Sequence, residues 1–261
     1  KCRDIGRCVF NDVVNEFRAK ALTADGFVFG SPVHYAALAG NMTSFMDRVF
    51  YSEANGNGNK AFYLKPAAAV ISARRAGTTV SFDQMNKYFT IQEMPVISSR
   101  YWNEVHGAVP EEVLQDKEGM YTMRVLGRNM AYFLRCQEAA RQAGLIYLAI
   151  TVFSMVLYVL AGLPLGMAVN QGLMTMSTSG GDSLFDFSQY DSLALEAAGA
   201  VSMLLASGNF LLYWKSWERR DFKSLFCDAE WRTFLTVVVV TGCLVSFHLW
   251  RFGVYEGWDN L

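Results

Sequence analysis

The sequence predicts a chain in two parts: an α/β domain with a parallel sheet, followed by a helical membrane segment that contains a re-entrant loop. Up to Gly144, short apolar runs alternate with helix-like segments, which is typical of a parallel sheet with helices on both faces. From Leu145 to Gly181 there is no Asp, Glu, Lys, Arg or His. A helix needs roughly 20 mostly apolar residues to cross the bilayer core. The chain is therefore expected to pass from water into the membrane near Leu145.

Composition argues against a nucleic-acid partner. The 261 residues carry a formal net charge of −1, and no basic stripe interleaved with aromatic residues occurs. The five scattered cysteines favour a reducing compartment over a disulfide framework. The gap of five residues between Cys2 and Cys8 matches neither zinc pairs nor compact iron–sulfur runs, so no metal site is expected there. The chain opens at Lys1 with no Met and no signal peptide, and we expect it to be a piece of a longer protein.

The first part is expected to alternate strands with helices. Phe27–Phe29 is a predicted buried strand that leaves its sheet at Gly30–Pro32, because proline cannot continue a hydrogen-bonded ladder. Further strands are predicted at Ala67–Ile71 and Pro95–Ile97. Apolar residues at helical spacing predict three helices, at Asn41–Tyr51, Ser81–Phe89 and Gly119–Ala143.

Two loops that follow these strands carry the candidate binding chemistry, because ligands of such sheets bind outside the carboxyl ends of the strands. The loop residues are Ser31, Pro32, Val33, His34 and Tyr35 in the first, and Ser72, Arg74, Arg75 and Gly77 in the second. Backbone donors, an aromatic neighbour such as Tyr35 and a cation such as Arg74 suit a planar, electron-rich cofactor. The alternative is that the first loop only turns the chain and that the arginines are solvated.

These stretches also carry the motifs of a known family. The motifs are Ala24–Tyr35, Gly40–Asn41, Phe45–Arg48, Ser72–Gly77, Asn86–Phe89, Met94–Val96, Tyr101–Asn103, His106–Gly107 and Leu126–Ala131. Residues 1–144 therefore resemble the flavodoxin-like NAD(P)H-dependent FMN reductases. The resemblance implies that Pro32–Tyr35 and Ser72–Gly77 border the isoalloxazine ring of FMN, with His106 as a further lining residue. It also implies hydride transfer from NAD(P)H to the flavin and on to an acceptor such as a quinone or nitro compound, with no catalytic side chain.

The resemblance begins partway through the family's fold. The family's first strand, phosphate-binding loop, first helix and second strand have no counterpart before Lys1. The absent loop would hold the FMN phosphate, and the absent strand would leave the strand at Phe27 with an unpaired edge. The expectation is therefore a partial flavodoxin-like domain, residues 1–144, with weak or absent FMN binding.

The second part is expected to cross the membrane near residues 145–161, 194–214 and 233–250. Between the first two spans, residues 164–181 form a shorter apolar segment that ends in a polar, glycine-containing turn, which is the pattern of a pore helix and re-entrant loop. Non-helical backbone at membrane depth must line water or be buried in protein. The turn residues Thr178, Ser179, Gly180 and Gly181 would then offer carbonyl oxygens to a dehydrated cation. The alternative is a plain helical hairpin with this turn outside the membrane.

Charge asymmetry predicts the orientation of these spans. Five Lys or Arg residues lie between residues 215 and 232, whereas residues 182–191 contain Asp but no Lys or Arg. The positive-inside rule puts the basic linker in the cytoplasm. Residues 145–261 would then lie in the inner (plasma) membrane, with residues 1–144 on its cytoplasmic side.

The second part resembles a second family. The matching motifs are Ala168–Gln171, Ser177–Ser183, Tyr190–Ser192, Ser207–Phe210 and Asp228–Arg232. They resemble the Trk/Ktr potassium uptake proteins, which have four repeats of outer helix, pore helix, filter loop and inner helix. The resemblance implies that Thr178–Gly181 supplies one quarter of a potassium filter. It also implies that the membrane, the other repeats or further copies of the chain, and a cytosolic nucleotide-binding regulatory subunit are partners.

The resulting prediction is a chimera with a junction near Leu145. Residues 1–144 would be a partial FMN reductase-like oxidoreductase, and residues 145–261 a transmembrane potassium-transporter fragment. An assembly or cloning junction explains two incomplete pieces. Two alternatives stay open: a genuine membrane-tethered, redox-linked potassium transport protein, and a non-functional fragment.

Overall fold

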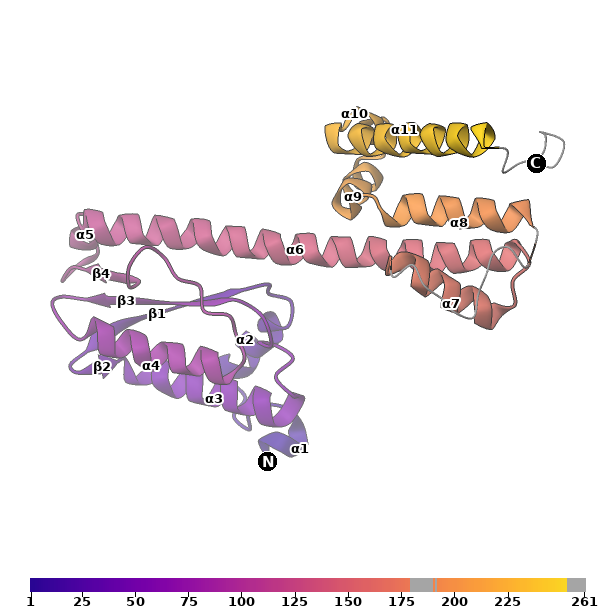
Figure 1. The fold of residues 1–261 in the computed structure, drawn as a ribbon. Helices are drawn as coiled ribbons and strands as arrows, with labels where there is room; N and C mark the ends of the chain where they lie inside the picture. The colour runs from indigo at the N-terminus through magenta and orange to yellow at the C-terminus, as the bar shows by residue number, and fades with distance from the viewer. Residues whose placement is uncertain (179–189, 191, 253–261) are drawn as a thin grey trace. The chain divides into compact units, whose positions relative to one another are not determined.

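A computed structural model describes residues 1–178, 190 and 192–252 of the chain. The chain divides into two compact units, Lys1–Gln137 and Glu138–Leu261, here called the first and second units. The boundary falls within one long helix, α6 (Lys117–Leu160) (Figure 1).

The first unit is built on a four-stranded sheet in the order β2-β1-β3-β4. The strands are β1 (Phe27–His34), β2 (Ala37–Leu38), β3 (Ala67–Ala73) and β4 (Glu104–His106). β1 and β4 both pair with β3 in parallel, and β2 pairs with β1 antiparallel. The helices before α6 are α1 (Cys2–Ile5), α2 (Val13–Ala21), α3 (Gly40–Asn57), α4 (Thr78–Ile91) and α5 (Pro110–Val113). The predicted class, a mainly parallel sheet followed by long apolar helices, is confirmed.

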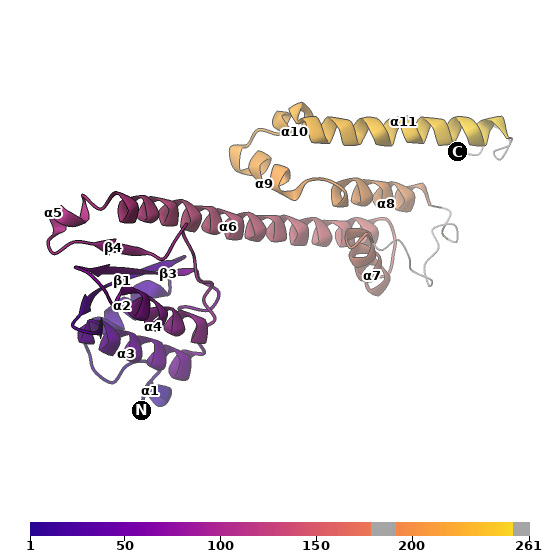
Figure 2. The same cartoon turned by 60° about the vertical axis from the view of Figure 1, so that its left-hand side comes forward.

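Helices cover both faces of this sheet. α2, α3 and α4 lie on one face, and the first part of α6 crosses the other (Figures 1 and 2). The larger core lies under α2 to α4 and contains a cluster of phenylalanine rings: Phe17, Phe27, Phe29, Phe50, Phe62 and Phe89. A smaller core joins Ala68 of β3 to Leu126 of α6. The sheet is covered on both faces at β3. At β1, Phe27 and Phe29 are buried on one face, and Val28 on the other face is exposed.

β1 is longer than predicted because it passes through Pro32 and ends at His34. The expectation that proline ends the strand was wrong. Phe27 donates its N–H to Pro66 O on the β3 side. Successive residues of a strand direct their backbone N–H groups to opposite sides. Because Phe27 directs its N–H toward β3, the nitrogen of Pro32 faces away from β3. Proline is tolerated there because that position needs no donor for the ladder with β3.

The third parallel strand is β4, and the predicted strand Pro95–Ile97 was wrong. The segment makes one isolated bridge, between Val96 and Ala67. Its hydrogen bonds all go to Ala67, whose N–H donates to Pro95 O and whose O accepts from Ile97 N. With no ladder beyond that residue, the segment remains a single bridge.

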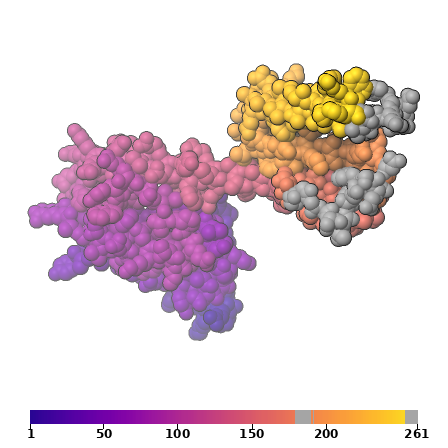
Figure 3. Space-filling model, in the orientation of Figure 1, coloured from indigo at the N-terminus to yellow at the C-terminus, as the bar shows by residue number. Residues whose placement is uncertain are grey.

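Where the structure describes it, the second unit contains the later part of α6 and five further helices. These are α7 (Leu165–Met176), α8 (Leu193–Ala206), α9 (Phe210–Arg219), α10 (Lys223–Cys227) and α11 (Ala229–Arg251). Within the described ranges, α6 and α11 are each long and apolar enough to cross a membrane. α11 has no buried residue, and Figure 3 shows it in yellow on the surface of this unit. Such an apolar surface suits a lipid environment.

The range 194–214, expected as one continuous span, is divided into α8 and α9, which meet at an angle of 90°. The break has a local cause. The side chain of Asn209 accepts hydrogen bonds from Leu211 N and Leu212 N and so caps the start of α9. Gly208 precedes it, where a Cβ would lie 1.7 Å from Tyr213 Oη. Only glycine fits this tight corner, so the bend is encoded by Gly208 and Asn209 together.

Candidate functional site

The structure brings the two predicted loops together at the carboxyl ends of β1 and β3. Pro32 lies opposite Ser72 in the parallel register. Gly77 has φ of 93°, and a Cβ at this residue would lie 3.0 Å from Cγ1 of Val33. The loops are therefore neighbours, and their contact requires glycine at position 77.

An open pocket of about 390 Å³ lies beside the first loop. It is lined by Val13, Gly30, Ser31, Pro32, Ala39, Asn41, Met42 and Phe45. Two predicted site residues, Ser31 and Pro32, belong to this lining. The other predicted residues lie outside it: Val33, His34, Tyr35, Ser72, Arg74, Arg75 and Gly77.

The sequence interpretation missed most of this lining. Met42 and Phe45 fell within the predicted helix Asn41–Tyr51 but not within the predicted site, and Val13 was not considered. One signal could have identified Asn41 and Met42: they open the helix that directly follows the loop, and the start of such a helix faces ligands bound at the strand ends. Val13 comes from α2, and only the tertiary fold brings it here.

The first loop is held by the Ser31 side chain. Ser31 is buried; its hydroxyl donates to Pro32 O at 3.0 Å and accepts from Ala39 N at 3.2 Å. This ties the end of β1 to the residue that precedes α3. Between them the chain turns at Tyr35, which has φ of 60° and is fully exposed. The turn presents the Tyr35 ring to solvent beside the pocket.

The two arginines of the second loop are exposed, and neither makes an ion pair within the described residues. Their charges are available to an anionic ligand. They do not line the pocket itself. Their exposure is consistent with the alternative that these arginines are solvated.

An ion pair anchors α2 against α3 next to the pocket. Arg48 donates from Nη2 to both carboxylate oxygens of Asp12, at 2.8 and 2.7 Å. The hydrogen bond from Arg48 lowers the pKa of Asp12 below its ordinary value. Asp12 also accepts from Val14 N and so caps α2. This cap fixes Val13 at the pocket wall.

Cys8 belongs to the same cluster. It is buried, and its Sγ accepts a hydrogen bond from Arg48 Nη2 at 3.3 Å. Cys2 lies on α1 and is half-buried. Within the residues that the structure describes, no three His, Cys, Asp or Glu side chains form a group that could hold a metal ion.

His106 lines a different, smaller pocket of about 90 Å³ with Tyr101, Trp102 and Glu104. The backbone N–H of His106 donates to Oδ2 of Asp116 at 2.8 Å. Burial favours a raised pKa for Asp116, but backbone hydrogen bonds from Gly119 and His106 outweigh burial, and the net pKa is lowered. This carboxylate thus joins β4 to the start of α6. His106 lines no part of the pocket at β1.

In the second unit, the predicted filter turn is described only at its first residue. Thr178 comes after Ser177, the C-cap residue of α7, and has φ of 52°. Its N–H donates to Thr175 O at 3.2 Å. The other predicted filter residues, Ser179, Gly180 and Gly181, lie outside the described residues.

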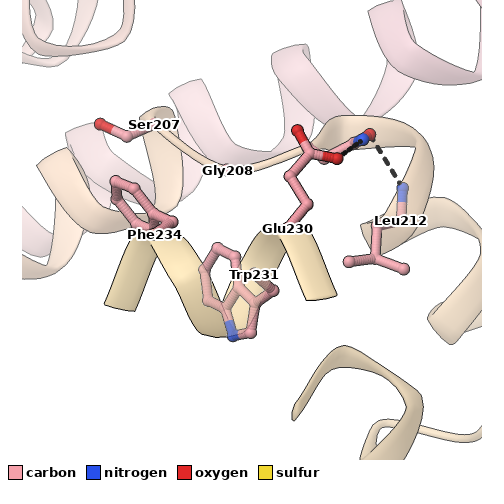
Figure 4. Close-up of a pocket in the computed structure, with 7 residues that line it drawn as sticks. Ser207, Gly208, Leu212, Glu230, Trp231 and Phe234 are labelled. Carbon is pink, nitrogen blue, oxygen red and sulfur yellow. Dashed lines mark hydrogen bonds between the residues drawn. The ribbon is translucent and has the colours of Figure 1, made fainter. Parts of the chain in front are cut away.

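A pocket of about 120 Å³ lies at the bend between α8 and α9. Asn209 Nδ2 donates to Glu230 Oε2 at 3.1 Å, and Glu230 is one of the lining residues labelled in Figure 4. The rings of Trp231 and Phe234 line the other side. This contact connects the bend to the first turn of α11.

Comparison with known proteins separates the two parts of the chain. Residues 1–108 match the family model of the NADPH-dependent FMN reductases. Over 140 residues, half of the chain, the sequence is 28% identical to the iron-sulfur flavoprotein MJ1083 of Methanocaldococcus jannaschii and covers 69% of that protein. The first part is therefore similar to FMN reductases and flavoproteins, in agreement with the resemblance seen in its motifs.

The later half is similar to potassium uptake proteins. It is 32% identical over 126 residues to the Trk system potassium uptake protein TrkG of Escherichia coli, which is 47% of this chain and 25% of that protein. It is 27% identical over 124 residues to TrkH of Salmonella typhimurium, with 26% of that protein covered. The chain thus spans about a quarter of the length of these relatives. With its apolar helices, the later half is a membrane-associated segment.

Proposed function

We propose that the chain joins an FMN-dependent NAD(P)H oxidoreductase domain, residues 1–144, to one repeat of a potassium transporter, residues 145–261. The observation that supports this proposal most directly is that the two halves are similar to two different kinds of protein. One kind is named for its flavin and the other for potassium uptake. The junction lies near Leu145, where the charged sequence gives way to the uncharged one.

In the first half, the flavin ring would lie against Pro32–Tyr35 and Ser72–Gly77. The pocket supports the part of this arrangement at β1, because it opens at the end of that strand and has an apolar wall from Met42 and Phe45. When bound, FMN supplies the capacity to take a hydride from NAD(P)H and to pass electrons to an acceptor. The chain's own residues would bind and orient it, with backbone donors from the two loops and a positive charge from Arg74 or Arg75.

The described pocket suits the ring better than the phosphate. None of its eight lining residues is Lys or Arg, although a phosphate dianion prefers such partners. The wall is also incomplete, whereas a retained ligand normally has most of its surface buried. These features support weak retention of FMN. The absorption spectrum of the purified chain is the test: stoichiometric flavin after purification would contradict weak retention.

In the second half, Thr178, Ser179, Gly180 and Gly181 would supply one quarter of a potassium filter. One repeat cannot surround an ion, so this role needs further repeats or further copies of the chain, together with the membrane. A cytosolic nucleotide-binding subunit is the proposed regulator. The five basic residues between positions 215 and 232, which extend from α9 into α11, support an inner-membrane location with residues 1–144 on the cytoplasmic side.

A chimeric junction and a genuine redox-linked transporter make different predictions at Leu145. The second candidate is favoured by one observation: α6 runs without a break from Lys117 to Leu160. Independent transcripts that read continuously through the codons for Leu145 and Ile146 would establish the genuine fusion; their absence is expected for the chimera. A negative flavin spectrum together with no rescue of growth at low potassium would indicate a non-functional fragment.

A further inference from the structure

A buried side-chain contact joins α6 to α7, the helix that leads to the proposed filter. α6 and α7 are joined by a short turn and pack closely: a Cβ on Gly172 of α7 would lie 2.7 Å from Cγ of Met155 on α6. Within this interface, Tyr158 of α6 is fully buried. Its hydroxyl lies 2.9 Å from Oγ1 of Thr175 on α7.

A second contact of Thr175 bears on which of the two hydroxyls donates in this hydrogen bond. The Thr175 hydroxyl donates to Gln171 O at 2.8 Å, which uses its only proton. Thr175 Oγ1 can then accept a hydrogen bond from the Tyr158 hydroxyl. A phenol in an apolar helix interface gains from such a partner, because an unpaired hydroxyl is unfavourable there.

Thr175 lies in the last turn of α7, next to the proposed filter. Thr175 O accepts the N–H of Thr178, the first filter residue, at 3.2 Å. Leu173 O accepts the N–H of Ser177 at 2.9 Å. Movement of the end of α7 would therefore move the backbone at Thr178. Filter carbonyls must keep their position to distinguish cations of different size or hydration.

We infer that Tyr158 is a positioning residue: through Thr175 it holds the end of α7, and thereby the backbone of Thr178, in the arrangement that favours K⁺ over Na⁺. This inference rests on the proposed potassium function. Tyr158 touches no ion. It acts across two helices, from a residue 20 positions before Thr178 in the sequence.

The test compares Tyr158→Phe and Thr175→Val, each of which removes the hydrogen bond and keeps the shape of the side chain. Tyr147→Phe is the matched control, because it removes a phenol hydroxyl from the same helix and keeps the ring contact with Phe210. The readout is the ratio of K⁺ to Na⁺ flux into vesicles that contain the protein. We expect each variant to lower this ratio about two- to tenfold, the factor of one buried hydrogen bond. The double variant should be no worse than either single one.

A second measurement separates this inference from the proposed function. Exchange of the Thr178 backbone amide should be faster in Tyr158→Phe and Thr175→Val and unchanged in Tyr147→Phe. If the wild type prefers K⁺ and both variants keep its ratio, the positioning role of Tyr158 is wrong. If amide exchange is unchanged, the mechanical link is wrong whatever the flux. A wild type without K⁺ preference overturns the potassium function and the selectivity role together, while faster amide exchange would still identify the contact that holds Thr178.

Discussion

Replacing Gly77 by Ala tests the contact that joins the two loops of the candidate flavin site. Gly77 has φ of 93°, a conformation that disfavours any side chain by roughly 1–2 kcal/mol. The new Cβ would also lie 3.0 Å from Val33 Cγ1, so the end of β1 must shift by a few tenths of an ångström. We expect a loss of about 2 kcal/mol in the free energy of unfolding of the first unit.

Pulse proteolysis of the full chain at increasing urea measures this loss. With a slope of about 2 kcal/mol per molar urea, the midpoint should fall by about 1 M. Gly40→Ala is the matched control, because a Cβ there meets nothing within 4 Å and the residue opens α3. FMN affinity should fall in Gly77→Ala and stay unchanged in the control. Equal urea midpoints for the two variants would refute the argument that the loops meet through Gly77.

Three further predictions concern other parts of the chain. Glu53→Gln removes a fully buried carboxylate from its ion pair and should destabilise the first unit by about 3–5 kcal/mol in the same assay, whereas Glu138→Gln, at an exposed pair, should change it by less than about 1 kcal/mol. Because Arg48 lowers the pKa of Asp12, this carboxylate stabilises the fold above its unfolded pKa of about 3.9 and loses that effect as pH falls through its lower folded pKa. Arg48→Met should return the Asp12 pKa toward its ordinary value in an NMR titration; an unchanged pKa would speak against the pair. Gly208→Ala would place a Cβ 1.7 Å from a tyrosine hydroxyl oxygen and should lower the melting temperature in detergent by roughly 5 °C; unaltered melting would show that the 90° bend is not fixed there.

The sequence was most informative where one physical rule acts locally. The apolar run Phe27–Phe29 correctly predicted a strand, although the structure buries only Phe27 and Phe29 of these three residues and exposes Val28. The uncharged stretch after Leu145 correctly predicted long apolar helices. Both predictions depend on neighbours within a few residues, which sequence periodicity reports directly.

Features that depend on tertiary contacts were missed. β2 contains only Ala37 and Leu38, too few residues to show a period, and it exists because the chain turns at Tyr35. Val13 lines the pocket because Asp12 is paired with an arginine on another helix. The bend before α9 had a local signal, a glycine followed by the helix-capping Asn209, but the apolar run around it favoured a continuous span.

The central claim is that FMN binds, weakly, in the pocket at the end of β1. A titration of the flavin-free chain with FMN, comparing Asn41→Trp with Ala54→Trp, tests it most directly. Both residues are exposed on α3, but only Asn41 lines the pocket. The account predicts saturable FMN binding to the wild type and to Ala54→Trp, and its loss in Asn41→Trp, where the indole fills the pocket. Equal FMN binding by all three chains, or binding by none, would contradict it.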